Sequence, residues 1–209
     1  MQRSKTHVGI DFDNTIVSYD ALFHQLATEQ GLIPRELAPN KTAVRDYLRS
    51  IGREDQWTAL QGIAYGERMD GAAAFPGAVD FIRACLSDGG RVSIISHRTQ
   101  APIVGKPVDL HAAARAWLDR NGVVELVGSG NIHFELTRKE KVARLQAAAC
   151  QYFIDDLPEF LSDLEFPSEV ERVLFDPACA HEPDERWRKV RAWKDFGTRP
   201  LEFLAGIEH

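Results

Sequence analysis

Two aspartates lie two residues apart directly after the first apolar run of the chain. Asp11 and Asp13 follow residues 8–10, and positions i and i+2 of an extended segment face the same side. Two carboxylates held close together repel each other unless a cation lies between them. Mg²⁺ prefers carboxylate oxygens and retained waters as ligands. The spacing therefore predicts a magnesium site, although Asp-x-Asp alone is also common in surface turns.

Two later apolar runs also end in residues that could do chemistry. Ser96 follows residues 91–95, and the pair Asp155 and Asp156 follows residues 152–154. Each has an ordinary alternative, since a serine can simply end a strand and an acidic pair can cap a helix. The carboxyl ends of parallel strands meet at one edge of a sheet, where ligands bind. The shared position of these residues at strand ends therefore indicates a binding site more strongly than any one residue does.

The elements that must position these residues alternate along the chain. Short runs rich in Val, Ile and Phe are typical of buried strands in a parallel sheet. Helical patterns lie between them, over residues 81–86, 110–118 and 137–149. Strand alternating with helix predicts an α/β fold with a doubly wound, Rossmann-like parallel sheet. A weaker apolar run at residues 123–127 predicts a strand or a turn, and residues 183–196 are expected to form a helix on the sheet.

One segment breaks this alternation. From about Tyr19 to Ala74 only helical patterns occur, separated by prolines and a glycine. We interpret residues 19–74 as a small all-helical insert after the first strand, within a core made of residues 1–18 and 75–209. The alternative is that these helices extend the core.

Composition and charge narrow the class of protein. The chain has 209 residues, of which 44% are hydrophobic and 27% charged, as in ordinary globular proteins. A net charge of −6 gives no support for a nucleic-acid partner. No stretch approaches the ~18 apolar residues of a membrane span, and no signal peptide is recognisable, so we expect no membrane partner and a cytoplasmic location. Three widely separated cysteines favour neither a disulfide framework nor a zinc cluster.

The order of the strand-end residues resembles the haloacid dehalogenase-like (HAD) hydrolase superfamily, in its phosphatase branch with a small helical cap. The first motif of that family, Asp-x-Asp-x-Thr/Val, matches Asp11, Asp13 and Thr15. The second motif, a hydroxyl residue that ends another apolar strand, matches Ser96. The resemblance extends over roughly residues 8–176, most of the chain.

The remaining two family motifs lie in the second half of the chain. The third, a lysine near the start of a later helix, matches Lys139 or Lys141. The spacing of the motif fits Lys139 better, but the sequence leaves the choice open. The fourth, an acidic pair after an apolar strand, matches Asp155 and Asp156.

The resemblance implies a role for each aspartate. Asp11 would attack phosphorus and form an aspartyl-phosphate, which splits one difficult displacement into two easier ones. Asp13 would protonate the leaving oxygen and then activate water. Mg²⁺ would be held by Asp11, Asp155 and the backbone carbonyl of Asp13, with Asp156 supporting the ion through water or second-sphere contacts.

The resemblance also implies a phosphate-binding set. Ser96 would donate a hydrogen bond to the phosphoryl oxygens, and the motif lysine, Lys139 or Lys141, would neutralise their charge. Asn14 could offer its amide to the phosphate, or only shape the turn. Arg98 could grip the phosphate with its planar fork, or be a solvated loop residue.

The resemblance implies a Mg²⁺-dependent phosphomonoesterase that acts on a small phosphorylated metabolite of the nucleotide or sugar phosphate class. Dehalogenase members of the superfamily lack an acid at the position of Asp13, because a departing halide needs no proton. Two alternatives stay open: a phosphotransferase or mutase that uses the same aspartyl-phosphate, and a HAD scaffold that serves as a non-catalytic binding subunit. The motifs specify neither the substrate nor the oligomeric state.

Overall fold

The structure, a computed structural model, describes residues 5–206. The chain divides into two compact units. The sheet unit comprises Met1–Ile16, Ala74–Arg98 and Asn121–His209, and the helical unit comprises Val17–Ala73 and Thr99–Arg120. Every predicted site residue belongs to the sheet unit.

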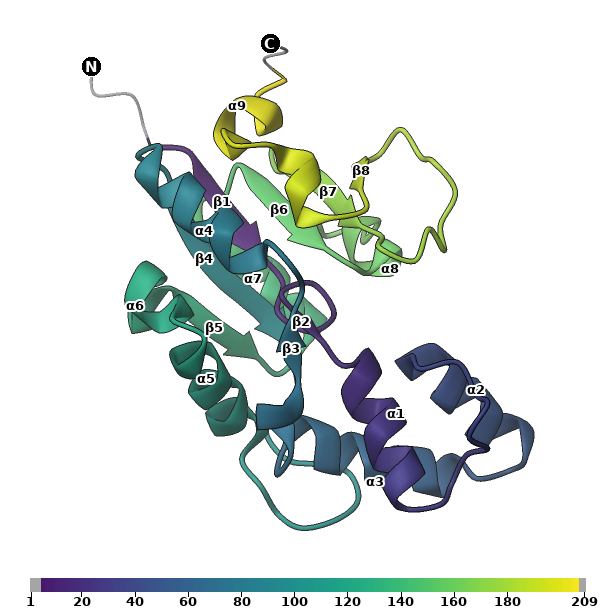
Figure 1. Ribbon diagram of the computed structural model, residues 1–209. Coiled ribbons are helices and arrows are strands. Elements are labelled where there is room, and N and C mark those ends of the chain that lie inside the picture. Colours follow the sequence, from purple (N-terminus) through teal and green to yellow (C-terminus); the bar gives the residue numbers. More distant parts are fainter. Residues whose placement is uncertain (1–4, 207–209) are drawn as a thin grey trace. The chain divides into compact units, whose positions relative to one another are not determined.

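The sheet unit is built on a six-stranded sheet (Figure 1). Its strands, in spatial order, are β5 (Ile132–Glu135), β4 (Arg91–His97), β1 (His7–Ile10), β6 (Tyr152–Asp155), β7 (Glu171–Phe175) and β8 (Arg188–Val190). All five neighbouring pairs are parallel. This sheet confirms the predicted α/β fold class.

The strand order reverses beside β1. Ile10 pairs with Ile94 of β4 on one side and with Ile154 of β6 on the other. The chain runs from β1 to β4 and β5, and then crosses to β6 on the opposite side of β1. Open α/β sheets bind ligands outside the carboxyl ends of the strands at such a reversal. Asp11 and Asp155 lie at the carboxyl ends of the two strands that border it.

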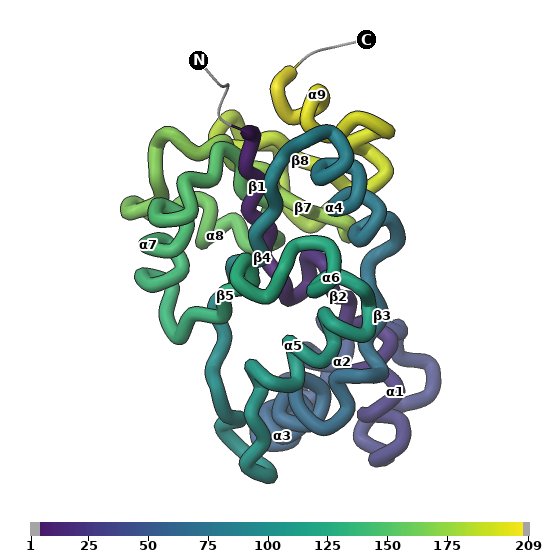
Figure 2. Tube along the Cα trace, turned by 90° about the vertical axis from the view of Figure 1, so that its left-hand side faces the viewer, coloured from purple at the N-terminus to yellow at the C-terminus, as the bar shows by residue number. Residues whose placement is uncertain are grey.

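Helices cover both faces of this sheet, as Figures 1 and 2 show from two directions. One face carries α4 (Ala78–Ser87), the short helix η3 (Trp193–Phe196) and α9 (Pro200–Leu204). The other face carries α7 (Arg138–Ala148) and α8 (Pro158–Leu161). Two further short helices, α6 (Val123–Val127) and η2 (Ser129–Asn131), precede β5.

The core beneath α7 and α8 explains a glycine in the central strand. Phe153 of β6 is fully buried in this core, together with Leu145 of α7 and Phe160 of α8. A Cβ atom at Gly9 would lie 2.7 Å from the Cδ2 atom of the Phe153 ring. Glycine at this position therefore lets Phe153 pack against β1, one residue pair before the strand ends that carry Asp11 and Asp155.

The helical unit contains the segment expected as an insert. It holds α1 (Asp20–Glu29), α2 (Lys41–Ser50), α3 (Glu54–Tyr65), the short helix η1 (Met69–Gly71) and α5 (Leu110–Arg120). The short strands β2 (Val17–Ser18) and β3 (Ala73–Ala74) pair with each other, and the chain passes from one unit to the other at them. Among residues 5–206, no helix is long and apolar enough to cross a membrane.

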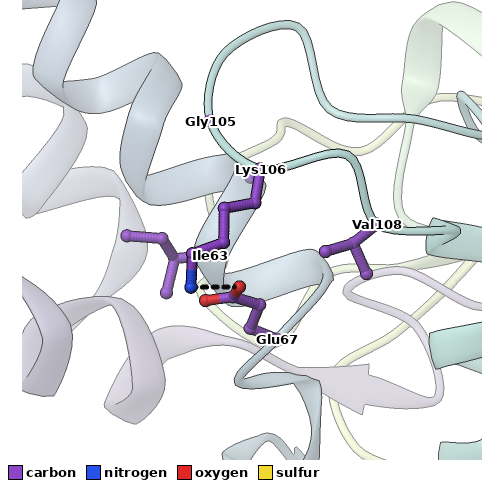
Figure 3. Close-up of a pocket in the computed structure, with 6 residues that line it drawn as sticks. Ile63, Glu67, Gly105, Lys106 and Val108 are labelled. Carbon is purple, nitrogen blue, oxygen red and sulfur yellow. Dashed lines mark ion pairs between the residues drawn. The ribbon is translucent and has the colours of Figure 1, made fainter.

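The helical unit also includes residues 99–120, which the sequence pattern placed in the core. The loop before α5 packs against α3, and a Cβ atom at Gly62 would lie only 2.6 Å from the carbonyl oxygen of Val104. Lys106 forms an ion pair with Glu67 at 2.9 Å beside the pocket shown in Figure 3. The Trp117 indole of α5 donates a hydrogen bond to the Ala72 carbonyl at 2.8 Å. An amphipathic pattern marks the buried face of a helix but not the body against which it packs.

Two local predictions were wrong. Residues 123–127 form the short helix α6, neither a strand nor a turn. Residues 183–196 contain the strand β8 and the 3₁₀ helix η3, although Trp187, Val190 and Trp193 have nearly helical spacing. The Asp195 carboxylate accepts hydrogen bonds from the backbone of Arg191 and Ala192, which ends β8 and starts η3. This side-chain cap competes with continuous helix.

Candidate active site

The carboxyl ends of the central strands bring the acidic residues together. Carboxylate oxygens of Asp11, Asp155 and Asp156 all lie within 4.8 Å of one another. Asp155 is fully buried and Asp11 is 4% exposed. The backbone amide of Asp11 donates to the Ile154 carbonyl at 2.9 Å, which continues the β1–β6 pairing up to the first aspartate. The parallel sheet thus joins two motifs that are more than 140 residues apart in sequence.

A buried lysine bridges two of these carboxylates. The Nζ atom of Lys141 lies 2.6 Å from Oδ1 of Asp11 and 2.6 Å from Oδ2 of Asp155. Only 1% of Lys141 is exposed, whereas Lys139, two residues earlier on the same helix, is exposed. Of the two lysines that the sequence left open, Lys141 is therefore the one in contact with the aspartates.

The start of α7 determines why Lys141 faces inward. Thr137 and Glu140 form a capping box, in which the Thr137 hydroxyl accepts the Glu140 amide and the Glu140 carboxylate accepts the Thr137 amide. Lys141 then shares the buried face of α7 with Val142 and Leu145. The cap fixes the first helical residue and with it the direction of the lysine side chain.

Two aromatic rings contact the ammonium group of Lys141. The Lys141 Nζ atom lies 4.1 Å from the centroid of the Phe160 ring and 5.2 Å from that of Phe153. Such cation–π contacts stabilise a desolvated ammonium by up to about 2 kcal/mol. Sequence reasoning missed Phe160, and its only signal is an aromatic residue on the short helix after the acidic pair.

The charges in this cluster strongly perturb one another. Burial raises the pKa of Asp11 to about 7, against the attraction of Lys141, and the carboxylates of Asp155 and Asp13 add to the increase. Burial alone would lower the pKa of Lys141, but the carboxylates of Asp11 and Asp155 outweigh it and raise that pKa. Lys141 therefore stays charged, while a second cation beside Asp11 would favour its ionised form.

Asp13 lies beside a buried arginine. Oδ1 of Asp13 is 3.1 Å from an Nη atom of Arg98, whose side chain is only 6% exposed. The guanidinium also lies 5.7 Å from the Phe12 ring centroid and 5.9 Å from that of Phe134. The Asp13 side chain is 22% exposed. The sequence offered Arg98 as a phosphate ligand; here it binds and orients the second aspartate of the pair.

The turn after β1 carries the remaining first-motif residues. Asn14 has a backbone φ of 58°, a left-handed conformation that asparagine tolerates better than most residues. The Thr15 hydroxyl donates to Oδ1 of Asp156 at 3.4 Å, and the Trp193 indole donates to the Thr15 carbonyl at 3.1 Å. Asn14 thus shapes the turn, and Thr15 ties it to the fourth motif. Ser96 is buried near the end of β4.

The donor set fits a hard divalent cation. Asp11, Asp155 and Asp156 supply only carboxylate oxygens, the ligand type that Mg²⁺ prefers. The ion pair with Lys141 uses one oxygen each of Asp11 and Asp155. The Leu157 amide donates to the other oxygen of Asp155 at 2.9 Å, which fixes the orientation of this carboxylate as is usual for metal ligands.

Comparison with known proteins identifies the class to which this fold and site belong. The chain matches the family model for haloacid dehalogenase-like hydrolases over residues 8–161. It therefore belongs to the haloacid dehalogenase-like hydrolase family and is an enzyme of the hydrolase class. No curated protein matches the chain.

Solved structures of three family members illustrate the similarity in fold. A HAD family hydrolase from Deinococcus radiodurans R1, with bound phosphate and sodium, has a TM-score of 0.58 at 15% identity, covering 97% of each chain. CbbY from Rhodobacter sphaeroides in complex with phosphate has a TM-score of 0.54 at 13% identity, over 93% of this chain and 97% of that one. The HAD-hydrolase YfnB from Bacillus subtilis, bound to magnesium, has a TM-score of 0.53 at 12% identity with the same coverage.

Proposed function

We propose that this chain is a Mg²⁺-dependent phosphomonoesterase that forms an aspartyl-phosphate on Asp11. The observation that carries the proposal is the buried bridge of Lys141 between Asp11 and Asp155, with Asp13 beside it. Two similar structures contain phosphate and a third contains magnesium, which supports the choice of phosphoryl chemistry within the family.

Asp11 is the proposed nucleophile. Its position at the carboxyl end of the central strand fixes its backbone, and Lys141 holds one carboxylate oxygen at 2.6 Å. In the first step, a carboxylate oxygen of Asp11 forms a bond to phosphorus while the bond from phosphorus to the leaving oxygen breaks. Holding the reacting groups in this geometry removes much of the entropic part of the barrier.

Asp13 is the proposed general acid and base. In the first step it gives a proton to the leaving oxygen, and in the second it takes a proton from the water that attacks the phosphorylated Asp11. Its partial exposure leaves it accessible to substrate, and Arg98 holds its carboxylate in one direction. We assign Arg98 primarily to this positioning role, and contact with the transferring phosphoryl group remains part of the proposal.

The transferring phosphoryl group needs donors to its oxygens. Lys141, Ser96 and Asn14 are the proposed ligands, since the first neutralises charge and the other two carry polar hydrogens. Lys139, which is exposed, has no part in this set. Preorganised donors of this kind contribute about 10²–10³ in kcat each.

The proposed metal ligands are Asp11, Asp155 and the backbone carbonyl of Asp13, with Asp156 as a further direct or water-mediated ligand. When bound, Mg²⁺ supplies positive charge beside the phosphoryl oxygens and the nucleophile. It also lowers the cost of ionising Asp11, whose pKa burial raises to about 7.

The proposed substrate is a small phosphorylated metabolite of the nucleotide or sugar phosphate class. A variant of CbbY was crystallised with xylulose-(1,5)bisphosphate (TM-score 0.51, 15% identity over 93% and 97% of the two chains), so this fold accommodates a sugar phosphate. We propose that the helical unit acts as a cap that selects the substrate and excludes water, as mobile lids commonly do.

The test is release of inorganic phosphate by the purified protein. An aryl phosphate and a panel of phosphorylated metabolites are offered with Mg²⁺, Mn²⁺ or Co²⁺, and with EDTA as the metal-free control. We expect turnover that requires a divalent cation and that disappears in Asp11→Asn. The proposal fails if neither the aryl phosphate nor any metabolite is hydrolysed. Transfer of phosphate to an added alcohol, in preference to water, would instead support a phosphotransferase.

A further inference from the structure

A cavity of about 490 Å³ lies in the sheet unit beside the carboxyl end of β7, apart from the aspartate cluster. Its walls are mainly apolar and include Phe75, Phe175, Pro177 and Trp193. The Phe175 ring lies 5.0 Å from the Phe75 ring and 5.3 Å from the Trp193 ring, measured between centroids. This "Trp193 cavity" has the size and the aromatic lining of a site for a flat organic group.

Two cations give the cavity a preferred charge. Arg191 and Lys194 line it and are both exposed. Within residues 5–206, neither side chain takes part in an ion pair. The neighbouring acid, Asp195, uses one carboxylate oxygen to accept the backbone amides of Arg191 and Ala192. An apolar cavity bordered by two such cations is complementary to an anion with an aromatic or otherwise flat apolar body.

The same cavity is connected to the proposed phosphate site. The Trp193 indole donates to the Thr15 carbonyl at 3.1 Å, and the Thr15 hydroxyl donates to Asp156 at 3.4 Å. The amide of Phe75 donates to the Ile16 carbonyl at 2.8 Å. The chain passes from the sheet unit to the helical unit after Ile16 and returns at Ala74. A ligand in the cavity would therefore touch Trp193, which is hydrogen-bonded to the segment that leaves the sheet unit, and Phe75, which lies on the segment that returns to it.

We propose that the Trp193 cavity is a second binding site, which accepts a small amphipathic organic anion and changes turnover at the phosphate site when it is occupied. Binding of the anion depends only on the cavity and its two cations. The effect of that binding on turnover rests on the proposed function, and it is transmitted through the hydrogen bond from Trp193 to Thr15.

The first experiment measures binding with the fluorescent probe anilinonaphthalene sulfonate (ANS), an aromatic anion. We expect one ANS molecule per chain, with energy transfer from tryptophan. The double variant Arg191→Gln/Lys194→Gln should bind ANS about five- to tenfold more weakly, since each exposed charge contributes modestly. The matched double variant Lys5→Gln/Arg120→Gln removes the same two charges elsewhere and should bind as the wild type does. Equal affinity in all three proteins, or no binding to the native chain, would overturn the site.

The second experiment measures coupling as the change in phosphate release at saturating ANS. The wild type should change its rate by about twofold or more, and Trp193→Phe, which cannot donate to Thr15, should still bind ANS but lose that response. An unchanged wild-type rate with ANS bound would refute the coupling. If the wild type releases no phosphate under any condition, the proposed function fails by its own test, while the ANS titration still decides whether the site exists.

Discussion

Replacing Lys141 with methionine tests the centre of the site most severely. Methionine keeps an unbranched side chain of similar length but removes the ammonium that lies 2.6 Å from both Asp11 and Asp155. Removing one partner of a buried ion pair leaves an uncompensated charge and typically costs about 3–5 kcal/mol. We therefore expect Lys141→Met to lower the free energy of unfolding by about 3 kcal/mol in EDTA, or about 6–12 °C in melting temperature for a chain of this size.

The pH dependence of that loss has a definite sign. Burial already raises the pKa of Asp11 to about 7 in the presence of Lys141, and removal of the cation raises it further. A carboxyl group with a raised folded-state pKa binds more protons in the native state, so its contribution to stability falls as pH rises towards that pKa. The deficit of Lys141→Met should therefore be larger at about pH 8 than at about pH 6, as measured by thermal unfolding.

Catalysis gives the sharper comparison, because α7 carries a matched control. Lys141→Met should lower kcat for an aryl phosphate by about 10²–10³ or more, since it removes a preorganised cation. Lys139→Met removes the same charge from an exposed position two residues earlier and should keep kcat within about twofold. A folded Lys141→Met protein that turns over normally, or a Lys139→Met protein that loses as much activity, would rule out the proposed role of Lys141.

Three further predictions follow from the same contacts. Arg98→Ala should lower kcat about tenfold with a smaller change in KM, and Arg98→Lys should restore little of that kcat, because lysine lacks the planar fork that holds Asp13. Steady-state kinetics on an aryl phosphate measures both constants, and a rise in KM alone would contradict the positioning role. At about pH 8, a Mg²⁺ concentration a hundredfold above its Kd should stabilise the protein by about 2.7 kcal/mol. The same concentration should stabilise it less at about pH 6, because a proton competes for Asp11, and a pH-independent thermal shift would contradict this. Phe160→Leu should cost about 1 kcal/mol more stability in the wild type than in Lys141→Met, because the ring contacts the ammonium only where it is present. Equal losses in the two backgrounds, measured by denaturant titration, would contradict this contact.

The sequence predicted the parallel sheet, and the position of the aspartates at one edge of it, because both depend on local patterns. Runs such as residues 8–10 and 152–154 are apolar throughout since strands buried on both faces need no polar side. Their polar successors then fall at one edge of the sheet by geometry alone, which is why Asp11, Asp155 and Asp156 lie together. The sheet reproduces that expectation, and the family match over residues 8–161 confirms the class to which it belongs.

The remaining features depend on contacts that a linear pattern does not contain. The choice between Lys139 and Lys141 depends on how α7 is rotated about its axis. The capping box fixes that rotation and turns Lys141 toward the aspartates. The spacing of the motif, which fits Lys139 better, contains no such information. The pairing of Arg98 with Asp13 joins residues 85 positions apart and depends on the rings of Phe12 and Phe134. Lysine and arginine side chains are also common on protein surfaces, so their presence in the sequence alone does not indicate these contacts.

The assignment of residues 99–120 was beyond the sequence for a related reason. The helix α5 follows a core strand in the chain, yet it belongs to the helical unit, and the loop before it approaches α3 closely at Gly62 and Val104. The loop before α5 contains Pro102, Gly105 and Pro107, which mark a turning chain path without indicating the element against which it packs. The division of a chain into units is a property of long-range packing, which alternation of strands and helices does not encode.

In the proposed function, Asp11 becomes covalently phosphorylated during turnover. The most direct test is mass spectrometry of the acid-quenched reaction with an aryl phosphate and Mg²⁺, followed by peptide mapping. We expect a single added phosphoryl group on the peptide that contains Asp11, with Lys141→Met lowering its yield and Asp11→Asn abolishing it. Rapid phosphate release with no phosphoryl group on that peptide, or undiminished release by Asp11→Asn, would contradict it.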